Sequence, residues 1–354
     1  MYINMLQAEG RVMGRRFFLT LVIGISAGFS FAYILLTSTG FSRDTAWHNY
    51  RKSARDFKKH PIAAVGEHSP DEPAHRDEDR SVADELYKKV RVLCWVMTQP
   101  KNHESKARHV KATWGKRCNK IIFMSTEKDP SLPSIKLPVK EGRKFLWGKT
   151  KAAFRYVYKH HRREADWFFK ADDDTYVVVE NLRHMLAGYD TEDPLYFGYR
   201  FKRFSPQGYM SGGAGYILSR AALDRFVNKG LPNTTLCRGD DNGIEDAEMG
   251  KCLENIGVPA MDSRDELKRG RFFPLTPDVH LLRSQIKKFD CCSDHAVSFH
   301  YIEPQVMYEL DYLIYHLRPY GIEHGSDTST LPKTLAGSIA TLPRRRLNNA
   351  SAVI

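Results

Sequence analysis

The sequence lacks the short motifs that identify several common classes of nucleotide-, metal- and nucleic-acid-binding protein. It contains no glycine-rich dinucleotide motif and no P-loop motif, which argues against both of those phosphate-binding architectures. It has no paired C-x-x-C spacing of the kind that structural zinc sites use, and no zinc-finger or basic-zipper spacing. No internal repeat is evident. Any functional site must therefore depend on other residues.

The net charge of the chain says little about which partner it binds. The 354 residues include 54 Lys and Arg against 42 Asp and Glu, a formal net charge of +12. Because the basic residues are spread along the chain and mixed with acids, they favour a solvated basic surface over a nucleic-acid-binding face. Attraction to anionic phosphates is the alternative. We therefore predict no nucleic-acid partner. The apolar content of 42% suits a globular protein.

One long apolar run lies near the N-terminus. Residues 17–36 form an uncharged stretch of 20 residues, which is long enough to cross the apolar core of a bilayer as a helix. Arg11, Arg15 and Arg16 precede it, so the positive-inside rule predicts that residues 1–16 are a cytosolic tail. A small-residue cleavage site is not evident after the run, which favours a membrane anchor over a cleaved signal peptide. We expect the rest of the chain to face the lumen or the outside.

Two weakly patterned segments flank a central ordered part. Residues 37–85 are polar and charged and predict a flexible stem, whereas residues 323–354 lose the periodic pattern and predict a loose tail. The six cysteines are an even count, which in a translocated chain favours disulfides without fixing their connectivity. Asn233 and Asn349 lie in sequons that could be glycosylated in the lumen or could be chance matches.

The ordered part begins with a strand–helix–strand pattern. Residues 91–97 form an apolar run typical of a buried strand, residues 103–114 have helical character, and residues 120–124 form a second strand. This βαβ unit predicts an α/β fold with a parallel sheet, in which ligands bind at the carboxyl ends of the strands. A further helix over 145–161 leads into a third apolar strand at 167–169.

An acidic triplet follows the third strand closely. Asp172, Asp173 and Asp174 come shortly after the apolar run at 167–169, and a second apolar run follows at 177–179. Two carboxylates one residue apart on a loop at a strand end can hold a hard divalent cation through oxygen, and such a cation can hold a diphosphate. An ordinary acidic turn is the alternative.

Three further features carry possible chemistry. The small-residue run at 211–215 lets backbone approach a ligand closely, or forms a strained turn before a helix. Glu245 and Asp246 begin a predicted helix, where they could complement its dipole or supply a general base. His300 lies in a predicted strand over 297–302, either as a core residue or as an imidazole ligand of a cation that carboxylates also hold.

Taken together, these segments resemble the core 1 β1,3-galactosyltransferases, which belong to a wider β1,3-glycosyltransferase family. Several long motifs in one order are far more specific than any one of them. The match covers residues 86–322 and includes CWVMTQP, HVKATWGKRCNK, KEGR, DWFFKADDDTYV, QGYMSGGAGYILS, IEDAEMGKC, CCSDHAVSFHYI and YHLRPYG.

The resemblance implies a GT-A glycosyltransferase fold, an α/β architecture in which a Rossmann-like nucleotide-binding half is fused to an acceptor-binding half. It implies an inverting enzyme that moves galactose from UDP-galactose to the 3-hydroxyl of N-acetylgalactosamine (GalNAc) α-linked to Ser or Thr, which makes the core 1 O-glycan. It also implies Mn²⁺, a single-pass type II anchor in the Golgi membrane with a lumenal catalytic domain, and a homodimer.

The resemblance assigns roles to matching residues of this chain. Asp172 and Asp174 would form the metal-binding acidic pair, with Asp174 the more direct ligand, and His300 would complete the protein ligands to Mn²⁺. Asp246 would be the catalytic base. The positions that resemble the donor-binding residues of the family, besides Asp172, are Met97, Glu141, Gly142, Arg143 and Lys149.

The resemblance also suggests disulfide pairs, and one segment of the chain departs from the family pattern. The preferred pairs are Cys94–Cys118 and Cys237–Cys252, while Cys291 and Cys292 could bridge to each other or remain thiols. The family has a longer, aromatic-rich stretch before CCSD that helps to form the acceptor site, whereas residues 283–290 are short here and contain no tryptophan. A β1,3-glycosyltransferase with another donor or acceptor is therefore an alternative. A non-catalytic, chaperone-like relative is another, although such relatives have lost the acidic triplet that this chain keeps.

Overall fold

The computed structural model describes residues 20, 22–31, 78–283 and 291–319. The chain divides into two compact units, Met1–Glu67 and His68–Ile354. In the first unit the described residues are helical and exposed. Among the residues that the structure describes, no helix is both long and apolar enough to cross a membrane. The predicted anchor at 17–36 lies partly outside the described residues, as does most of the predicted stem, and the predicted tail lies outside them entirely.

The second unit is organised around a six-stranded mixed sheet with the order β3-β2-β1-β4-β9-β6. The first four strands in this order are parallel, whereas β9 runs antiparallel to both β4 and β6. The strands are β1 (Val92–Met97), β2 (Lys120–Ser125), β3 (Ser134–Lys136), β4 (Trp167–Asp172), β6 (Tyr196–Gly198) and β9 (Tyr216–Ser219).

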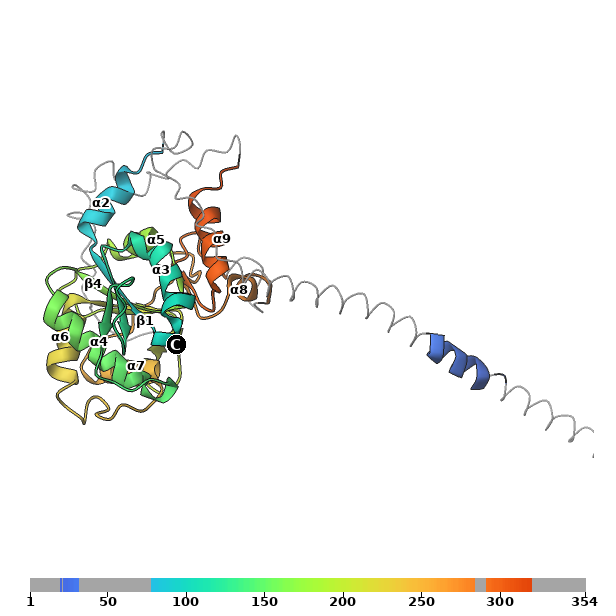
Figure 1. The fold of residues 1–354 in the computed structure, drawn as a ribbon, viewed down its shortest axis with the longest axis horizontal. Coiled ribbons are helices and arrows are strands. Elements are labelled where there is room, and N and C mark those ends of the chain that lie inside the picture. Colours follow the sequence, from blue (N-terminus) through green and yellow to red (C-terminus); the bar gives the residue numbers. More distant parts are fainter. Residues whose placement is uncertain (1–19, 21, 32–77, 284–290, 320–354) are drawn as a thin grey trace, which may run out of the picture. The chain divides into compact units, whose positions relative to one another are not determined.

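Both faces of this sheet are covered by helices, which explains why β1 is apolar at every position. Val92, Cys94 and Val96 pack into one core, and the alternate residues of the strand pack into the other. Helices α2, α3 and α5 contribute to the first core and α4, α6 and α7 to the second, as Figure 1 shows on either side of β1 and β4. Each fully buried apolar side chain of this kind contributes about 1.5–3 kcal/mol to stability.

The remaining elements connect and cover the sheet. The α-helices are α2 (Ser81–Lys89), α3 (Arg108–Ala112), α4 (Leu146–His161), α5 (Val179–Leu186), α6 (Arg220–Arg225), α7 (Glu245–Asn255), α8 (Pro277–Arg283) and α9 (Pro304–Tyr315). The tighter or wider helical turns are η1 (Pro100–Asn102), η2 (His103–Ala107), η3 (Trp114–Arg117), η4 (Arg143–Phe145) and η5 (Phe226–Gly230). The small strands β7 (Arg200–Phe201) and β8 (Tyr209–Met210) form a two-stranded sheet.

A second small sheet brings the C-terminal part of the unit against the acidic triplet. Its order is β10 (Phe272–Phe273), β11 (Ser298–Phe299) and β5 (Tyr176–Val177). β11 pairs antiparallel with β5, so Phe299 lies opposite Tyr176. The amide of Ile302 also donates to the carbonyl of Asp174 at 2.9 Å. Residues more than a hundred positions apart in the chain therefore meet at one edge of the main sheet.

The predicted elements agree with this fold except at four places. The helix predicted over 103–114 is divided into η2 and α3. The small-residue run at 211–215 leads into strand β9, not into a helix as one interpretation held, because the helix starts only at Arg220 behind the cap Ser219. The sheet is mixed and not wholly parallel. Helix α2 begins within the range predicted for the stem, with Leu86 buried.

All six cysteines are paired. Disulfides join Cys94 to Cys118 and Cys237 to Cys252, which confirms the pairing suggested by the family resemblance. Cys291 and Cys292 bond to each other, which settles the alternative left open by the sequence.

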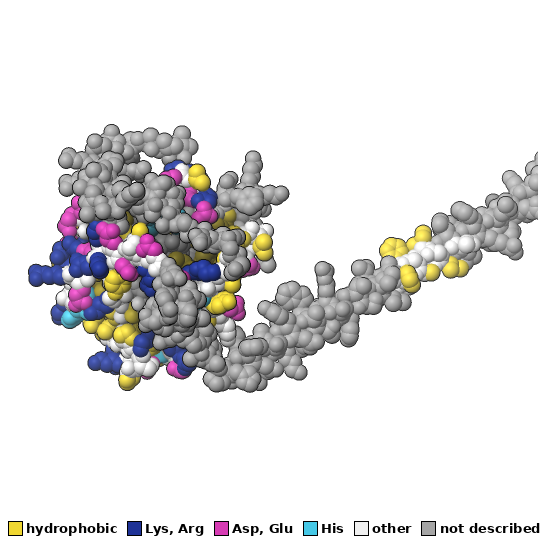
Figure 2. All heavy atoms as spheres, turned by 90° about the horizontal axis from the view of Figure 1, so that it is seen from above, with side chains coloured by type: hydrophobic (Ala, Val, Ile, Leu, Met, Phe, Trp, Pro, Cys, Tyr) yellow, Lys and Arg dark blue, Asp and Glu magenta, His cyan; other side chains and the backbone are white. Residues whose placement is uncertain are grey.

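On the face seen in Figure 2, Lys and Arg side chains are interspersed with Asp and Glu, as in an ordinary solvated surface.

Candidate active site

The candidate site lies where β1 and β4 end. Met97, the last residue of β1, is in register with Asp172, the last residue of β4. The chain then turns, and the amide of Thr175 donates to the carbonyl of Asp172 at 3.2 Å. The indole of Trp114 donates to the carbonyl of Thr175 at 2.8 Å, which ties the turn to the start of η3. The acidic triplet thus occupies a fixed turn at the sheet edge where α/β folds bind ligands.

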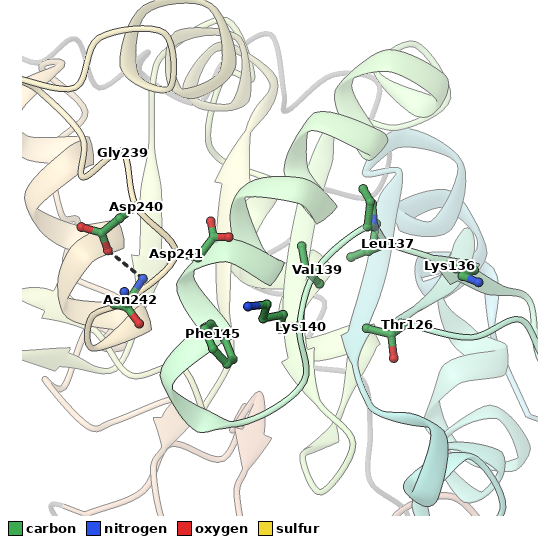
Figure 3. A pocket seen from close by; sticks show the side chains of 11 residues that line it. Thr126, Lys136, Leu137, Val139, Lys140, Phe145, Gly239, Asp240, Asp241 and Asn242 are labelled. Atoms are coloured by element: carbon green, nitrogen blue, oxygen red, sulfur yellow. Dashed lines mark hydrogen bonds between the residues drawn. The ribbon is translucent and has the colours of Figure 1, made fainter.

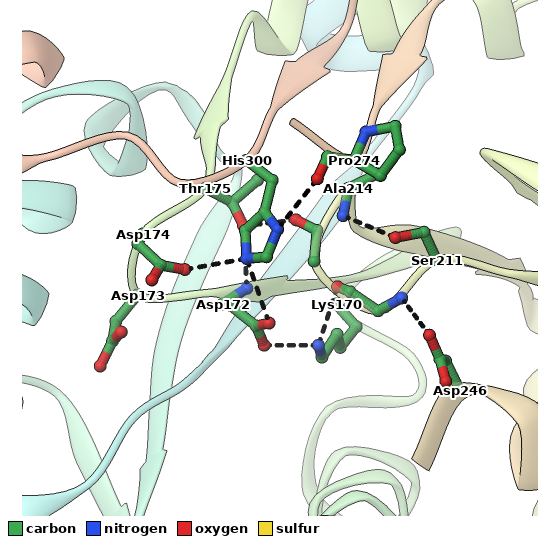
Figure 4. Close-up of polar contacts among 12 residues, drawn as sticks. Lys170, Asp172, Asp173, Asp174, Thr175, Ser211, Ala214, Asp246, Pro274 and His300 are labelled. Atoms are coloured by element: carbon green, nitrogen blue, oxygen red, sulfur yellow. Dashed lines mark hydrogen bonds and ion pairs between the residues drawn. The ribbon is translucent and has the colours of Figure 1, made fainter. Parts of the chain in front are cut away.

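The middle carboxylate of the triplet faces the protein interior. Asp173 is only 6% exposed and accepts hydrogen bonds from Thr98 Oγ1 at 2.7 Å and Asn102 Nδ2 at 2.9 Å. Burial raises the pKa of Asp173 to about 6, although both hydrogen bonds act in the opposite direction. Figure 4 shows this side chain directed away from His300. Asp173 therefore ties the turn to the segment after β1 and is separate from the cluster formed by its two neighbours.

The outer carboxylates of the triplet converge on one imidazole. His300 Nε2 lies 3.2 Å from Asp174 Oδ1 and 3.9 Å from Asp172 Oδ2. One ligand atom from each of the three residues lies within 4.8 Å of the others, so that together they could hold one metal ion. Figure 4 shows the three side chains pointing toward one another from β4, the turn and the residue after β11.

The imidazole of His300 is oriented by its other ring nitrogen. Nδ1 lies 3.3 Å from the carbonyl of Pro274, so an Nδ1–H donor leaves Nε2 free to accept or to coordinate. Metal-binding histidines commonly use the second nitrogen in this way. The ring also fits only because Gly213 has no side chain, since a Cβ there would lie 2.6 Å from Nε2 and closer still to two other ring atoms.

Two lysines hold the far oxygens of the same carboxylates. Lys170 Nζ donates to Asp172 Oδ1 at 2.5 Å, and Lys106 Nζ donates to Asp174 Oδ2 at 2.8 Å. Each carboxylate is thus fixed by one oxygen and presents the other to His300. Burial alone raises the pKa of Asp174, but the hydrogen bonds and charges of His300 and Lys106 outweigh it and lower the pKa to about 2. The carboxylate remains ionised and available to a cation.

The acidic pair at the start of α7 divides into two different environments. Glu245 is buried, accepts hydrogen bonds from Thr150 Oγ1 at 2.8 Å and Tyr216 OH at 2.7 Å, and has a pKa raised by burial. Asp246 instead faces the small-residue run, where its Oδ2 accepts from the amide of Gly212 at 3.1 Å. Figure 4 shows Lys170 between Asp246 and the cluster of Asp172, Asp174 and His300. Their position in the helix does not tell these two carboxylates apart, and only the family resemblance assigned the base to Asp246.

The predicted donor-binding residues form a second group along the same edge. Lys149 is buried, and its Nζ donates to the carbonyl of Thr98 at 2.6 Å and to both oxygens of Glu141 at 2.8 and 2.9 Å. Burial lowers the pKa of Lys149, with Glu141 acting in the opposite direction. Gly142 has a φ of 116°, which favours glycine, and Arg143 beyond it is exposed. Met97 adjoins this group through Thr98.

A pocket of about 770 Å³ opens beside the Glu141–Lys149 pair. It adjoins that pair through Thr126, whose hydroxyl donates to Glu141 at 2.7 Å. Figure 3 shows its wall formed by the segment after β2 on one side and by the loop before α7 on the other. The lining residues are Thr126, Lys136, Leu137, Pro138, Val139, Lys140, Phe145, Gly239, Asp240, Asp241 and Asn242.

Three parts of this site were missed by reasoning from the sequence. The local sequence does not mark Lys106 or the loop at 239–242 as part of a site, because exposed acids and a lysine on a helical segment are common. Lys170 does carry one, because a lysine inside the apolar strand β4 must find a partner in the interior.

The chain belongs to the Fringe-like family, a family of β1,3-glycosyltransferases, because the model of that family matches residues 88–267. It is therefore a glycosyltransferase by family, which accords with a carboxylate–imidazole cluster at the strand ends of an α/β fold.

Individual proteins are similar to this chain to different extents. Over 266 residues the chain is 50% identical to glycoprotein-N-acetylgalactosamine 3-beta-galactosyltransferase 1 of Xenopus laevis, which covers 71% of this chain and 73% of that relative. A beta-1,3-glucosyltransferase of Mus musculus is 30% identical over 179 residues, or 50% of this chain and 36% of that relative. A crystal structure of a glycosyltransferase involved in glycosylation of the major capsid of PBCV-1 aligns with 63% of this chain at 12% identity and a TM-score of 0.35.

Proposed function

We propose that the chain is an inverting galactosyltransferase of the GT-A fold. It moves galactose from UDP-galactose to the 3-hydroxyl of GalNAc on a glycoprotein and so makes the core 1 O-glycan. The observation that carries the proposal is the convergence of Asp172, Asp174 and His300, in a chain 50% identical to a galactosyltransferase of the same acceptor class. Asp246 meets the same small-residue run, since it contacts Gly212 while His300 lies against Gly213.

The cluster has the chemistry expected for Mn²⁺. Carboxylate oxygens suit Mn²⁺, and an imidazole nitrogen can complete such a set. The orientation of His300 by Pro274 and of the two carboxylates by Lys170 and Lys106 supports this assignment, because metal ligands are usually fixed by partners of this kind. Bound there, Mn²⁺ would neutralise the charge that develops on the leaving diphosphate.

The donor is proposed to bind along the edge formed by Met97, Glu141, Gly142, Arg143 and Lys149. The Glu141 carboxylate can accept hydrogen bonds from ribose or base, and it is positioned by the buried ammonium of Lys149. The exposed guanidinium of Arg143 is available to a phosphate. The backbone at Gly142 leaves room for close approach.

Asp246 is proposed as the general base. Its carboxylate would take the proton from the acceptor 3-hydroxyl as that oxygen attacks the anomeric carbon, while the bond to UDP breaks on the opposite face. One displacement inverts the configuration from α to β, so no nucleophile of the protein is needed. A well-placed base contributes about 10²–10⁴-fold in rate. The hydrogen bond from Gly212 fixes the direction of this carboxylate.

The cellular setting is proposed from the sequence. Residues 17–36 would anchor the chain in the Golgi membrane as a single-pass type II protein, with the catalytic domain in the lumen. The three disulfides support an oxidising compartment. The partners would be the UDP-sugar, the GalNAc-glycoprotein and a second copy of the chain.

The test is a product assay with the purified full chain, UDP-galactose, Mn²⁺ and a GalNAc-glycopeptide. Mass spectrometry and linkage analysis should find one added hexose in β1,3 linkage. Absence of product with this pair, in the presence of folded protein, would refute the proposal. The short segment at 283–290 favours a second candidate, a β1,3-glycosyltransferase with another acceptor or donor. Product from a different pair in a panel of UDP-sugars and acceptors would support it.

A further inference from the structure

A lysine is buried in the centre of the candidate site. Lys170 lies on β4 between apolar neighbours and is 1% exposed. A buried ammonium is costly unless it is paired and hydrogen-bonded. Its Nζ donates to Asp172 Oδ1 at 2.5 Å and to the carbonyl of Gly212 at 2.9 Å. Neither the proposed metal site nor the proposed base includes this residue.

The second contact of Lys170 leads to the proposed base. The same Gly212 whose carbonyl receives the lysine donates its amide to Asp246 Oδ2 at 3.1 Å. Figure 4 shows the path from Asp172 through Lys170 and the small-residue run to Asp246. A Cβ at Gly212 would lie 2.9 Å from Glu245 Oε2 and 3.4 Å from Lys170 Nζ, so the backbone fits closely between them.

The charges around the lysine are compensated. Burial alone lowers the pKa of Lys170, but the charges of Asp172, Glu245 and Asp246 and the hydrogen bond to Asp172 outweigh it and raise the pKa. The ammonium forms its ion pair with Asp172, and the charges of Glu245 and Asp246 act on it from further away.

We infer that Lys170 is a positioning residue that fixes the metal-binding carboxylate of Asp172 and, through the Gly212 backbone, the carboxylate of Asp246. Cation binding and proton removal then depend on one buried ammonium group. The inference rests on the proposed function, since it takes Asp172 as a metal ligand and Asp246 as the base.

If Lys170 acted only through its charge, its removal would have the opposite effect on Mn²⁺ affinity. A cation beside a metal site repels the metal, so its removal would tighten Mn²⁺ binding. Loss of a group that orients a ligand instead weakens metal affinity by about 10–100-fold. Because the ammonium is already paired with Asp172 and also donates to the Gly212 carbonyl, we expect the loss of orientation to dominate.

The first experiment measures Mn²⁺ binding by the full chain through the electron paramagnetic resonance signal of free Mn²⁺. The variant is Lys170→Met, and Lys151→Met is the matched control. Lys151 is also buried, but its Nζ donates to the carbonyls of Gly239 and Asp240 and reaches no metal-binding carboxylate. Lys170→Met should weaken binding by about 10–100-fold, and the control should match the wild type. Unchanged or tighter binding by Lys170→Met would overturn the inference.

The second experiment uses Gly212→Ala and tests the link through the Gly212 backbone to Asp246, whether or not Lys170→Met folds. The added Cβ would lie 2.9 Å from Glu245 Oε2, so the Gly212 backbone or the Glu245 carboxylate must shift next to the hydrogen bond from the Gly212 amide to Asp246. At 3.4 Å from Lys170 Nζ the Cβ makes an ordinary contact, so we expect the bond between Lys170 and Asp172 to stay in place. We expect a lower kcat with an unchanged Mn²⁺ affinity. An unchanged kcat would overturn the link to Asp246. If the wild type transfers no galactose, the proposed function fails, but the Mn²⁺ measurement still decides the role of Lys170.

Discussion

Alanine at position 213 should remove His300 from the proposed metal-binding cluster. In the structure the Gly213 carbonyl accepts a hydrogen bond from Thr175 Oγ1 at 2.8 Å, so its backbone is held in place. A Cβ there would lie 2.6 Å from His300 Nε2, whereas ordinary contacts start at 3.4 Å. The imidazole is held by side-chain contacts with Asp174 and the Tyr301 ring and by the 3.3 Å contact with Pro274, and a side chain can rotate more readily than this backbone can move. We therefore expect the ring to yield.

The displacement is large on the scale of metal coordination. The nearest ring atom, Cε1, would lie 2.1 Å from the added Cβ, so the ring must retreat by about 1.3 Å to reach an ordinary contact at 3.4 Å, whereas metal–ligand distances vary by only about 0.2 Å. His300 would thus cease to be a ligand. Since disturbing an outer partner of a ligand already costs about 10–100-fold in affinity, loss of the ligand itself should cost at least that. Overpacking should also lower the free energy of unfolding by about 1–3 kcal/mol.

The assay is a Mn²⁺ titration of wild type and Gly213→Ala, followed by galactosyl transfer at low and at high Mn²⁺. Gly188→Ala is the matched control, because nothing lies within 4 Å of a Cβ at that position. Excess Mn²⁺ should restore part of the activity of Gly213→Ala, and thermal unfolding will show that the variant is folded. If it binds Mn²⁺ as tightly as Gly188→Ala does, the imidazole is not a ligand and the reasoning is refuted.

The other predictions follow from the same structure. Asp246→Asn should lower kcat by about 10²–10⁴-fold without weakening UDP binding; turnover close to that of the wild type would show that another group removes the proton. Chelation by EDTA should abolish transfer and added Mn²⁺ should restore it, so full activity in chelator would contradict the metal site. Asp166→Asn should lower the free energy of unfolding at pH 7 by about 1–3 kcal/mol. Burial raises the pKa of Asp166, but Arg91 and Arg220 outweigh it, so the folded pKa lies below the ordinary 3.8. The stabilisation is therefore complete above that value and lost as pH falls through the folded pKa. Urea denaturation should find a difference that shrinks below about pH 3.8, and a constant difference would argue against the ion pair as its source.

Much of the local structure follows from the sequence alone. The apolar run at 91–97 and the periodic pattern at 145–161 predict β1 and α4, because a strand buried on both faces and an amphipathic helix each leave a local pattern. The acidic triplet at the end of β4 and the family motifs also indicate a metal-dependent glycosyltransferase site. These features depend on neighbouring residues and so can be read along the chain.

Other features depend on which distant segments meet. Whether His300 reaches Asp174 is decided by the pairing of β11 with β5, and no local pattern encodes that register. Likewise, the family resemblance named Asp246 as the base, but only packing shows that Glu245 bonds to Tyr216 in the interior while Asp246 meets Gly212.

The sequence by itself determined the strands and helices around the sheet, the residue types of the site and the family to which they belong. The tertiary structure decided that Gly213 makes room for an imidazole, and that Lys170 joins Asp172 to the backbone beside Asp246. The physical reason is the distance along the chain over which each effect acts. Propensity and periodicity act within a few residues, whereas coordination and buried charge pairing require atoms brought within about 3 Å by the whole fold.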